Sequence, residues 1–80
     1  MSDLAVVRSL AGRDKGGLYC VVGQEGEYLL LADGKRRRAE TPKRKKSRHT
    51  EEAGRLSTAE PATNRRLREA LAVFRDQGGN

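Results

Sequence analysis

The chain has 80 residues, of which 35% are hydrophobic and 35% are charged, and its formal net charge is +6. A chain of this length forms one small domain with a modest core, and no apolar run approaches the ~20 residues of a membrane-spanning helix. The single cysteine, Cys20, excludes an intramolecular disulfide framework, and the first residues lack the basic and long apolar regions of a signal peptide. We therefore expect a cytoplasmic protein that has no association with a membrane.

Two apolar runs near the start of the sequence, Leu4 to Leu10 and Leu18 to Val22, predict the first two β-strands. The first run alternates imperfectly and does not show which of its residues face the core. The second run is apolar or aromatic throughout, which is typical of a strand that is covered on both faces. A third strand is expected from Glu27 to Ala32, after a turn in which Gly26 takes the left-handed conformation.

Residues 11–17, with the sequence AGRDKGG, are expected to form a tight turn between the first two strands. Glycine tolerates positive φ, and aspartate hydrogen-bonds its own backbone in turns. Arg13 and Lys15 would extend from this turn toward solvent, either to bind a partner or only to keep the protein soluble. The residues expected to shape the turn are Gly12, Asp14 and Gly16.

The segment from Lys35 to His49 carries nine of the 17 Lys and Arg residues and one acid, whereas the rest of the chain has a net charge of −2. The dipeptide Asp33-Gly34 predicts a hairpin turn that leads into a polar fourth strand, Arg36 to Thr41, and a fifth short strand is expected near Lys45 to Thr50. Cations along such a strand are spaced like the phosphates of a nucleic acid, although a solvated tail that binds any polyanion weakly would have the same composition. The predicted nucleic-acid-binding residues are Arg13, Lys15, Lys35, Arg36, Arg37, Arg38, Lys43, Arg44, Lys45, Lys46, Arg48 and His49.

The last third of the sequence separates into two parts. Residues 50–62 have no apolar period and predict a flexible linker. Residues 63–77 predict an amphipathic α-helix, because apolar residues recur on one face. Since a helix of this length is marginal alone in water, the face must dock on the strands or on a partner. The face proposed for partner docking consists of Leu67, Leu71 and Phe74.

The string from Ser9 to Gly16, set between two apolar strands, resembles the KOW motif of large-subunit ribosomal proteins and NusG-type elongation factors. The likeness is closest to small bacterial KOW-domain RNA-binding proteins, which resemble an archaeal and eukaryotic ribosomal protein family of the large subunit. It continues in order through Ala32-Asp33-Gly34, Arg37-Arg38, Pro42-Lys43 and Lys46 to His49, and departs from the family at Thr50, where an apolar residue is usual.

The resemblance implies a mainly β fold, a small SH3-like (KOW) antiparallel barrel over residues 1–49. The basic strip at residues 35–49 would extend from this barrel, and the short C-terminal α-helix would follow the linker. It also implies a ribosome-associated or translation-linked role, whereas the residues alone imply only the binding of a polyanion.

The sequence contains no recognisable catalytic or metal centre, since it has one His and one Cys, and its glycine-rich turn lacks the ending of a phosphate-binding P-loop. We expect a protein that is not an enzyme, uses no cofactor and docks on structured RNA, above all ribosomal RNA, through phosphate contacts. One alternative is a protein-interaction module of the transcription or translation machinery that uses the C-terminal helix. Another is an architectural DNA-binding protein, although no minor-groove wedge is evident.

Overall fold

Five β-strands and one α-helix make up the computed structural model, which describes residues 2–13, 15–58 and 63–78. The helix, α1 (Asn64–Gly78), is the last element, and a short 3-10 helix (Ser47–His49) precedes the last strand. The fold is therefore mainly β with a C-terminal helix, as the sequence predicts. The strands are β1 (Ser2–Ser9), β2 (Leu18–Glu25), β3 (Tyr28–Ala32), β4 (Lys43–Lys46) and β5 (Thr50–Thr58).

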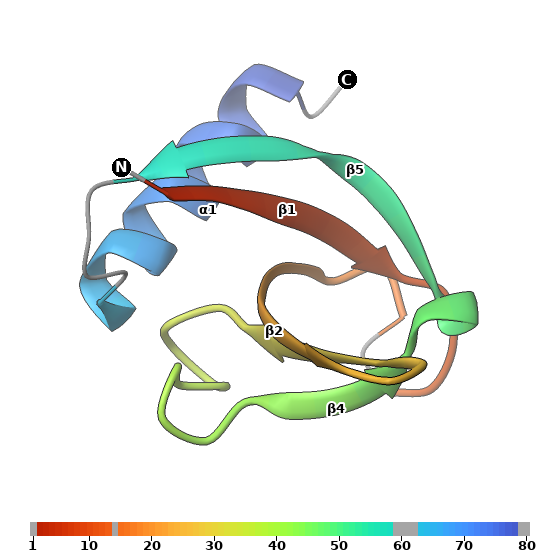
Figure 1. Cartoon of the computed structure of the whole chain (residues 1–80). Coiled ribbons are helices and arrows are strands. Elements are labelled where there is room, and N and C mark those ends of the chain that lie inside the picture. The colour runs from red at the N-terminus through yellow and green to blue at the C-terminus, as the bar shows by residue number, and fades with distance from the viewer. Residues whose placement is uncertain (1, 14, 59–62, 79–80) are drawn as a thin grey trace.

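The strands form one antiparallel sheet in the order β4-β3-β2-β1-β5. Figure 1 shows this sheet strongly curved, with β1 and β5 arching over one side of the molecule and β2 and β4 on the other. Bulges at Ala53 in β5 and Val22 in β2 shift the register and bend the strands. Within the described residues no pairing joins the edge strands β4 and β5, so the sheet is curved but not closed.

The predicted fourth strand is wrong, because residues 36–41 form a loop. The carboxylate Oδ1 of Asp33 accepts hydrogen bonds from the amides of Lys35 and Arg37, each at 2.9 Å. The amides of Asp33 and Gly34 donate in turn to the carbonyl of Arg37. These bonds close a compact turn in which the amides of Lys35 and Arg37 are already paired, and pairing with β3 begins only at Lys43.

The linker predicted at residues 50–62 is also wrong over most of its length, because Thr50–Thr58 is β5 and pairs with β1 from Ser2 to Ser9. The bulge at Ala53 interrupts the alternation of side chains, which removes the two-residue period from the sequence of this strand. Residues 59–62 lie outside the described part of the chain. The predicted fifth strand near Lys45 to Thr50 is likewise corrected, since that stretch contains the end of β4 and the 3-10 helix.

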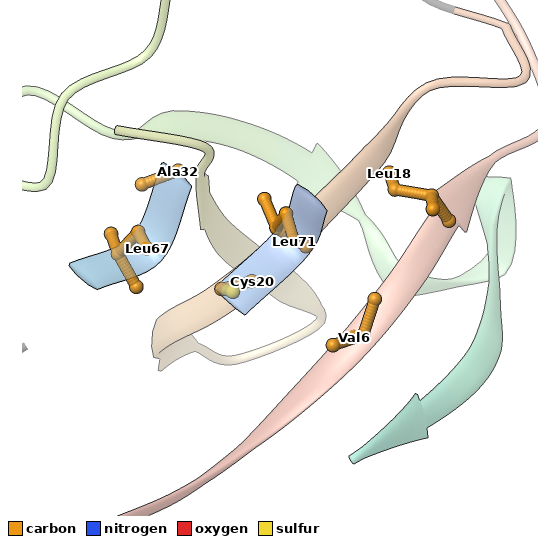
Figure 2. Packing of buried hydrophobic residues seen from close by; sticks show 6 residues of the cluster. All are labelled: Val6, Leu18, Cys20, Ala32, Leu67 and Leu71. Carbon is orange, nitrogen blue, oxygen red and sulfur yellow. The ribbon is translucent and has the colours of Figure 1, made fainter. Parts of the chain in front are cut away.

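The core lies between the sheet and α1. Leu67 and Leu71 of α1 are each 1% exposed and pack with Val6, Cys20 and Ala32 of the strands, and Figure 2 shows the two leucines over the strands that carry these residues. Phe74 packs against the same cluster. The hypothesis that this helix face docks a partner is therefore corrected, because the face is used inside the chain, where burial of its apolar area stabilises the helix.

Candidate nucleic-acid interface

The glycine-rich turn has the backbone conformation that its sequence predicts. Gly12 and Gly16 have positive φ angles of 82° and 88°, a region that glycine enters without steric cost. The base of the turn is closed by two hydrogen bonds between β1 and the turn, from the Gly16 amide to the Ser9 carbonyl at 2.8 Å and from the Ser9 amide to the Gly17 carbonyl at 3.0 Å. Asp14 lies outside the described residues. The turn thus holds exposed side chains at Arg13 and Lys15.

The basic strip is attached to this turn. The Nζ of Lys45 in β4 donates a hydrogen bond to the carbonyl of Ala11 at 2.8 Å, and the Leu10 amide donates to the carbonyl of His49 at 2.9 Å. Residues more than thirty positions apart are therefore fixed side by side. The ammonium group of Lys45 therefore supports the turn from β4.

The loop that carries Arg36 and Arg37 is clamped at its other end by α1. The Ala39 amide donates to Asn64 Oδ1 at 2.7 Å, and Asn64 Nδ2 donates to Glu40 Oε1 at 2.6 Å. The hydrogen bond from Asn64 lowers the pKa of the Glu40 carboxyl, with help from Arg38. Gly34 is buried against the same asparagine. Asn64 thus fixes the loop from the first turn of the helix.

The turn and the loop meet at one cleft, which has a volume of about 520 Å³. Alternation along β2 places Tyr19 on the opposite face of the sheet from Leu18 and Cys20, which belong to the core under α1. The ring of Tyr19 is half-buried and lines the cleft together with five cations. We call this site the Tyr19 cleft, and its lining residues are Arg13, Lys15, Gly17, Tyr19, Arg36, Arg37 and Lys43.

The positive surface continues from this cleft toward α1. A neighbouring hollow of about 270 Å³ shares Tyr19 and Arg36 with the Tyr19 cleft and adds Lys35 and Arg75. It is also lined by the acid Asp33, whose Oδ1 accepts hydrogen bonds from two loop amides. A third hollow places Arg68 beside Lys35 and Arg75. Arg68 and Arg75 are not among the binding residues predicted from the sequence. They are seven residues apart, so they lie on the same face of the helix, and this spacing is the sequence signal that marks them as a pair.

The remaining cations of the strip lie elsewhere. Arg44 and Lys46 alternate with Lys43 and Lys45 along β4, so they point to the other face of the strand. The guanidinium of Arg44 lies 4.6 Å from the ring centre of Tyr28 and 3.5 Å from Glu25, and the Lys46 ammonium is 5.9 Å from the same ring. The predicted strip therefore divides into two surfaces, of which only one borders the Tyr19 cleft.

The other predicted binding residues also lie away from this cleft. Arg38 pairs with Glu40 at 3.4 Å. Arg48 and His49 are exposed in the 3-10 helix and do not line the Tyr19 cleft.

The described residues contain no cluster of three or more His, Cys, Asp or Glu side chains suited to a metal ion, and no helix among them combines the length and apolar character needed to cross a membrane. Cys20 is fully buried, and burial raises the pKa of its thiol to about 11. Scanned against family models and searched against curated proteins, the chain matches none of them.

Proposed function

We propose that the protein is a non-enzymatic RNA-binding protein that docks on structured RNA, above all ribosomal RNA, through phosphate contacts. The observation that carries this proposal is the meeting of cations from two distant segments at one cleft, Arg13 and Lys15 from the turn and Arg36 and Arg37 from the loop. If the turn had been on the far side of the molecule from the loop, a single polyanion would not reach both.

Phosphate is the ligand that this chemistry favours. Arg side chains bind phosphate oxygens through two parallel hydrogen bonds or stack on bases, and Lys binds phosphate as a point charge. The cations project from a backbone that is fixed by the Lys45–Ala11 bond and the Asn64 clamp, so part of the ordering cost of binding is already met by folding.

The ribosomal assignment depends on the resemblance to KOW-domain proteins, which extends from the glycine-rich turn to His49. The strong curvature of the sheet supports an SH3-like arrangement, although the finer classification as a KOW barrel is part of the proposal. We place the protein in the cytoplasm, in association with ribosomal particles. The alternative of a protein-interaction module loses its main support, because Leu67 and Leu71 are buried in the chain's own core.

The proposal is tested by measuring the affinity for a fluorescently labelled fragment of structured ribosomal RNA over a range of salt concentrations. Neutralisation of about five to eight phosphates predicts a slope of log K against log salt of about −4 to −7. A slope near zero would rule the proposal out. Duplex DNA serves as competitor, and equal competition by the duplex would instead favour an architectural DNA-binding protein.

The ribosomal part of the proposal has its own measurement. In a sucrose gradient of cell lysate, the protein should sediment with ribosomal particles at low salt and remain near the top at high salt, because phosphate contacts weaken as salt rises. Sedimentation as a free protein at both salt concentrations would contradict a ribosomal role. RNA binding itself is tested by the salt titration.

A further inference from the structure

We propose that the Tyr19 cleft is a nucleotide pocket, in which an unpaired RNA base stacks on Tyr19 while the surrounding cations hold its phosphates. This inference rests on the proposed RNA-binding function and adds to it a ligand class, an unpaired nucleotide rather than a paired helix. It also assigns Tyr19 a role that phosphate binding alone does not require.

The composition of the cleft fits a nucleotide. One aromatic side chain lies among five cations, and the volume of about 520 Å³ falls within the range of about 300–1,000 Å³ that is typical of small-molecule pockets. Proteins that bind single-stranded nucleic acids combine the same two parts, a positively charged groove along the backbone and an aromatic ring on which a base stacks.

The place of Tyr19 in the sheet also favours stacking. Its neighbours in β2, Leu18 and Cys20, belong to the core under α1, whereas Tyr19 points to the other face of the sheet and lines the Tyr19 cleft. A half-buried ring held by a strand loses little conformational freedom on binding, which favours stacking.

Tyr28 is also half-buried and belongs to the adjacent strand of the sheet. Two cations of the chain itself lie over the ring of Tyr28, at 4.6 Å and 5.9 Å from its centre, and Tyr28 does not line the Tyr19 cleft. Tyr28 therefore supplies a matched control, a half-buried tyrosine of the same sheet that lies outside the Tyr19 cleft.

Two separate segments supply the cations near Tyr19. Arg13 and Lys15 approach Tyr19 from the turn, and Arg36 and Arg37 approach it from the loop. A base on Tyr19 would thus lie among cations of both segments, which can neutralise the phosphates next to that nucleotide. Such an arrangement favours a loop, bulge or single-stranded end of a folded RNA, where bases are already unstacked.

The test compares two labelled RNA hairpins that have the same stem and the same number of phosphates, one with an intact loop and one with an abasic loop. The wild-type protein should bind the intact hairpin about 5- to 150-fold more tightly, the range that corresponds to one stacked base. Tyr19→Leu should bind the two hairpins with the same affinity. Tyr19→Phe and Tyr28→Leu should keep the wild-type preference, because each retains the ring at position 19.

Two outcomes would overturn the inference: equal binding of both hairpins by the wild type, or an equal loss on both hairpins in Tyr19→Leu, which would give Tyr19 a purely structural role. Thermal unfolding of each variant identifies those that fail to fold, and Tyr19→Phe then decides through the hairpin preference alone. A different result would contradict the proposed function, because that function requires the RNA affinity to depend steeply on salt whichever loop is present. A steep dependence without a preference would contradict only the nucleotide pocket.

Discussion

Gly34 shows how a single residue couples the basic loop to the helix. Its φ of 77° lies in the left-handed region, and a Cβ at this position would overlap the backbone carbonyl of Asn64. Asn64 in turn bonds to Ala39 and Glu40 of the loop. The Asp33-Gly34 pair therefore does more than form a turn, because the absence of a side chain at Gly34 allows the loop to lie against α1.

Gly34→Ala should lower the free energy of unfolding by about 3 kcal/mol, since it adds overlap with Asn64 to the cost of a left-handed conformation. Gly26→Ala is the matched control, because Gly26 has a φ of 60° and open space around it. This control should cost about 1 kcal/mol. Denaturant titrations measure both, and equal losses would show that Gly34 is not packed against α1.

The buried thiol of Cys20 should make the free energy of unfolding depend on pH in the alkaline range. Burial raises the pKa of its thiol from 9.0 to about 11, so the folded chain keeps this proton between those pH values while the unfolded chain releases it. The contribution is fully present below pH 9 and is lost as the pH rises through 11, for a total of about 3 kcal/mol. Denaturant titrations of the wild type and Cys20→Ala should show this extra decline in the wild type alone. Parallel pH profiles would contradict it.

At the scale of elements, α1 is part of the fold. A helix of this length is marginal in isolation, and its apolar stripe is buried between the helix and strands β1, β2 and β3. Figure 2 shows Leu67 and Leu71 reaching the residues of these strands. The helix also fixes the basic loop through Asn64 and supplies Arg68 and Arg75 to the positive surface. Loss of α1 would thus affect both stability and the proposed interface.

Leu71→Ala should lower the free energy of unfolding by about 2–5 kcal/mol, because it leaves a cavity under the helix. Val73→Ala removes an apolar group from the same helix, but Val73 is 51% exposed, and its loss should cost less than about 1 kcal/mol. Urea titrations compare the two variants. If Leu71→Ala proved as stable as Val73→Ala, the helix would not be docked and its apolar face would again be open to a partner.

The elements divide into those that local sequence determines and those that it does not. The first three strands, the left-handed Gly26 and the helix follow from apolar patterns and turn residues, and the structure confirms them. The fourth strand was misplaced because the Asp33 carboxylate binds two loop amides. The strand β5 was missed because a bulge at Ala53 breaks its alternation, and its formation depends on pairing with the distant β1.

The candidate site was predictable only in part. Charge density alone identifies Arg13, Lys15 and the strip as cationic, but it does not separate Lys43, which borders the cleft, from Lys45, which bonds to the turn. That difference arises from strand register and from contacts between residues far apart in the sequence. The same holds for Arg75, which reaches the surface only because α1 packs beside the basic loop.

At the scale of the whole molecule, a curved sheet and one helix hold cations from three segments along one surface. The turn, the loop and α1 contribute to adjoining hollows that share Tyr19, Arg36 or Lys35. The molecule measures 29 × 27 × 20 Å. The central claim is that the turn and the loop act together on one RNA.

The salt dependence of RNA binding by charge-neutralised variants tests this claim most directly. Arg13→Gln/Lys15→Gln in the turn and Arg36→Gln/Arg37→Gln in the loop should each reduce the steepness of the salt slope by about 2, because each cation neutralises one phosphate. Arg55→Gln/Arg65→Gln is the matched control.

The control pair removes the same charge from exposed sites away from the Tyr19 cleft, and its slope should equal that of the wild type. If the loop variant reduced the slope while the turn variant behaved like the control, the two segments would not share an RNA, and the account of a single cleft would be contradicted.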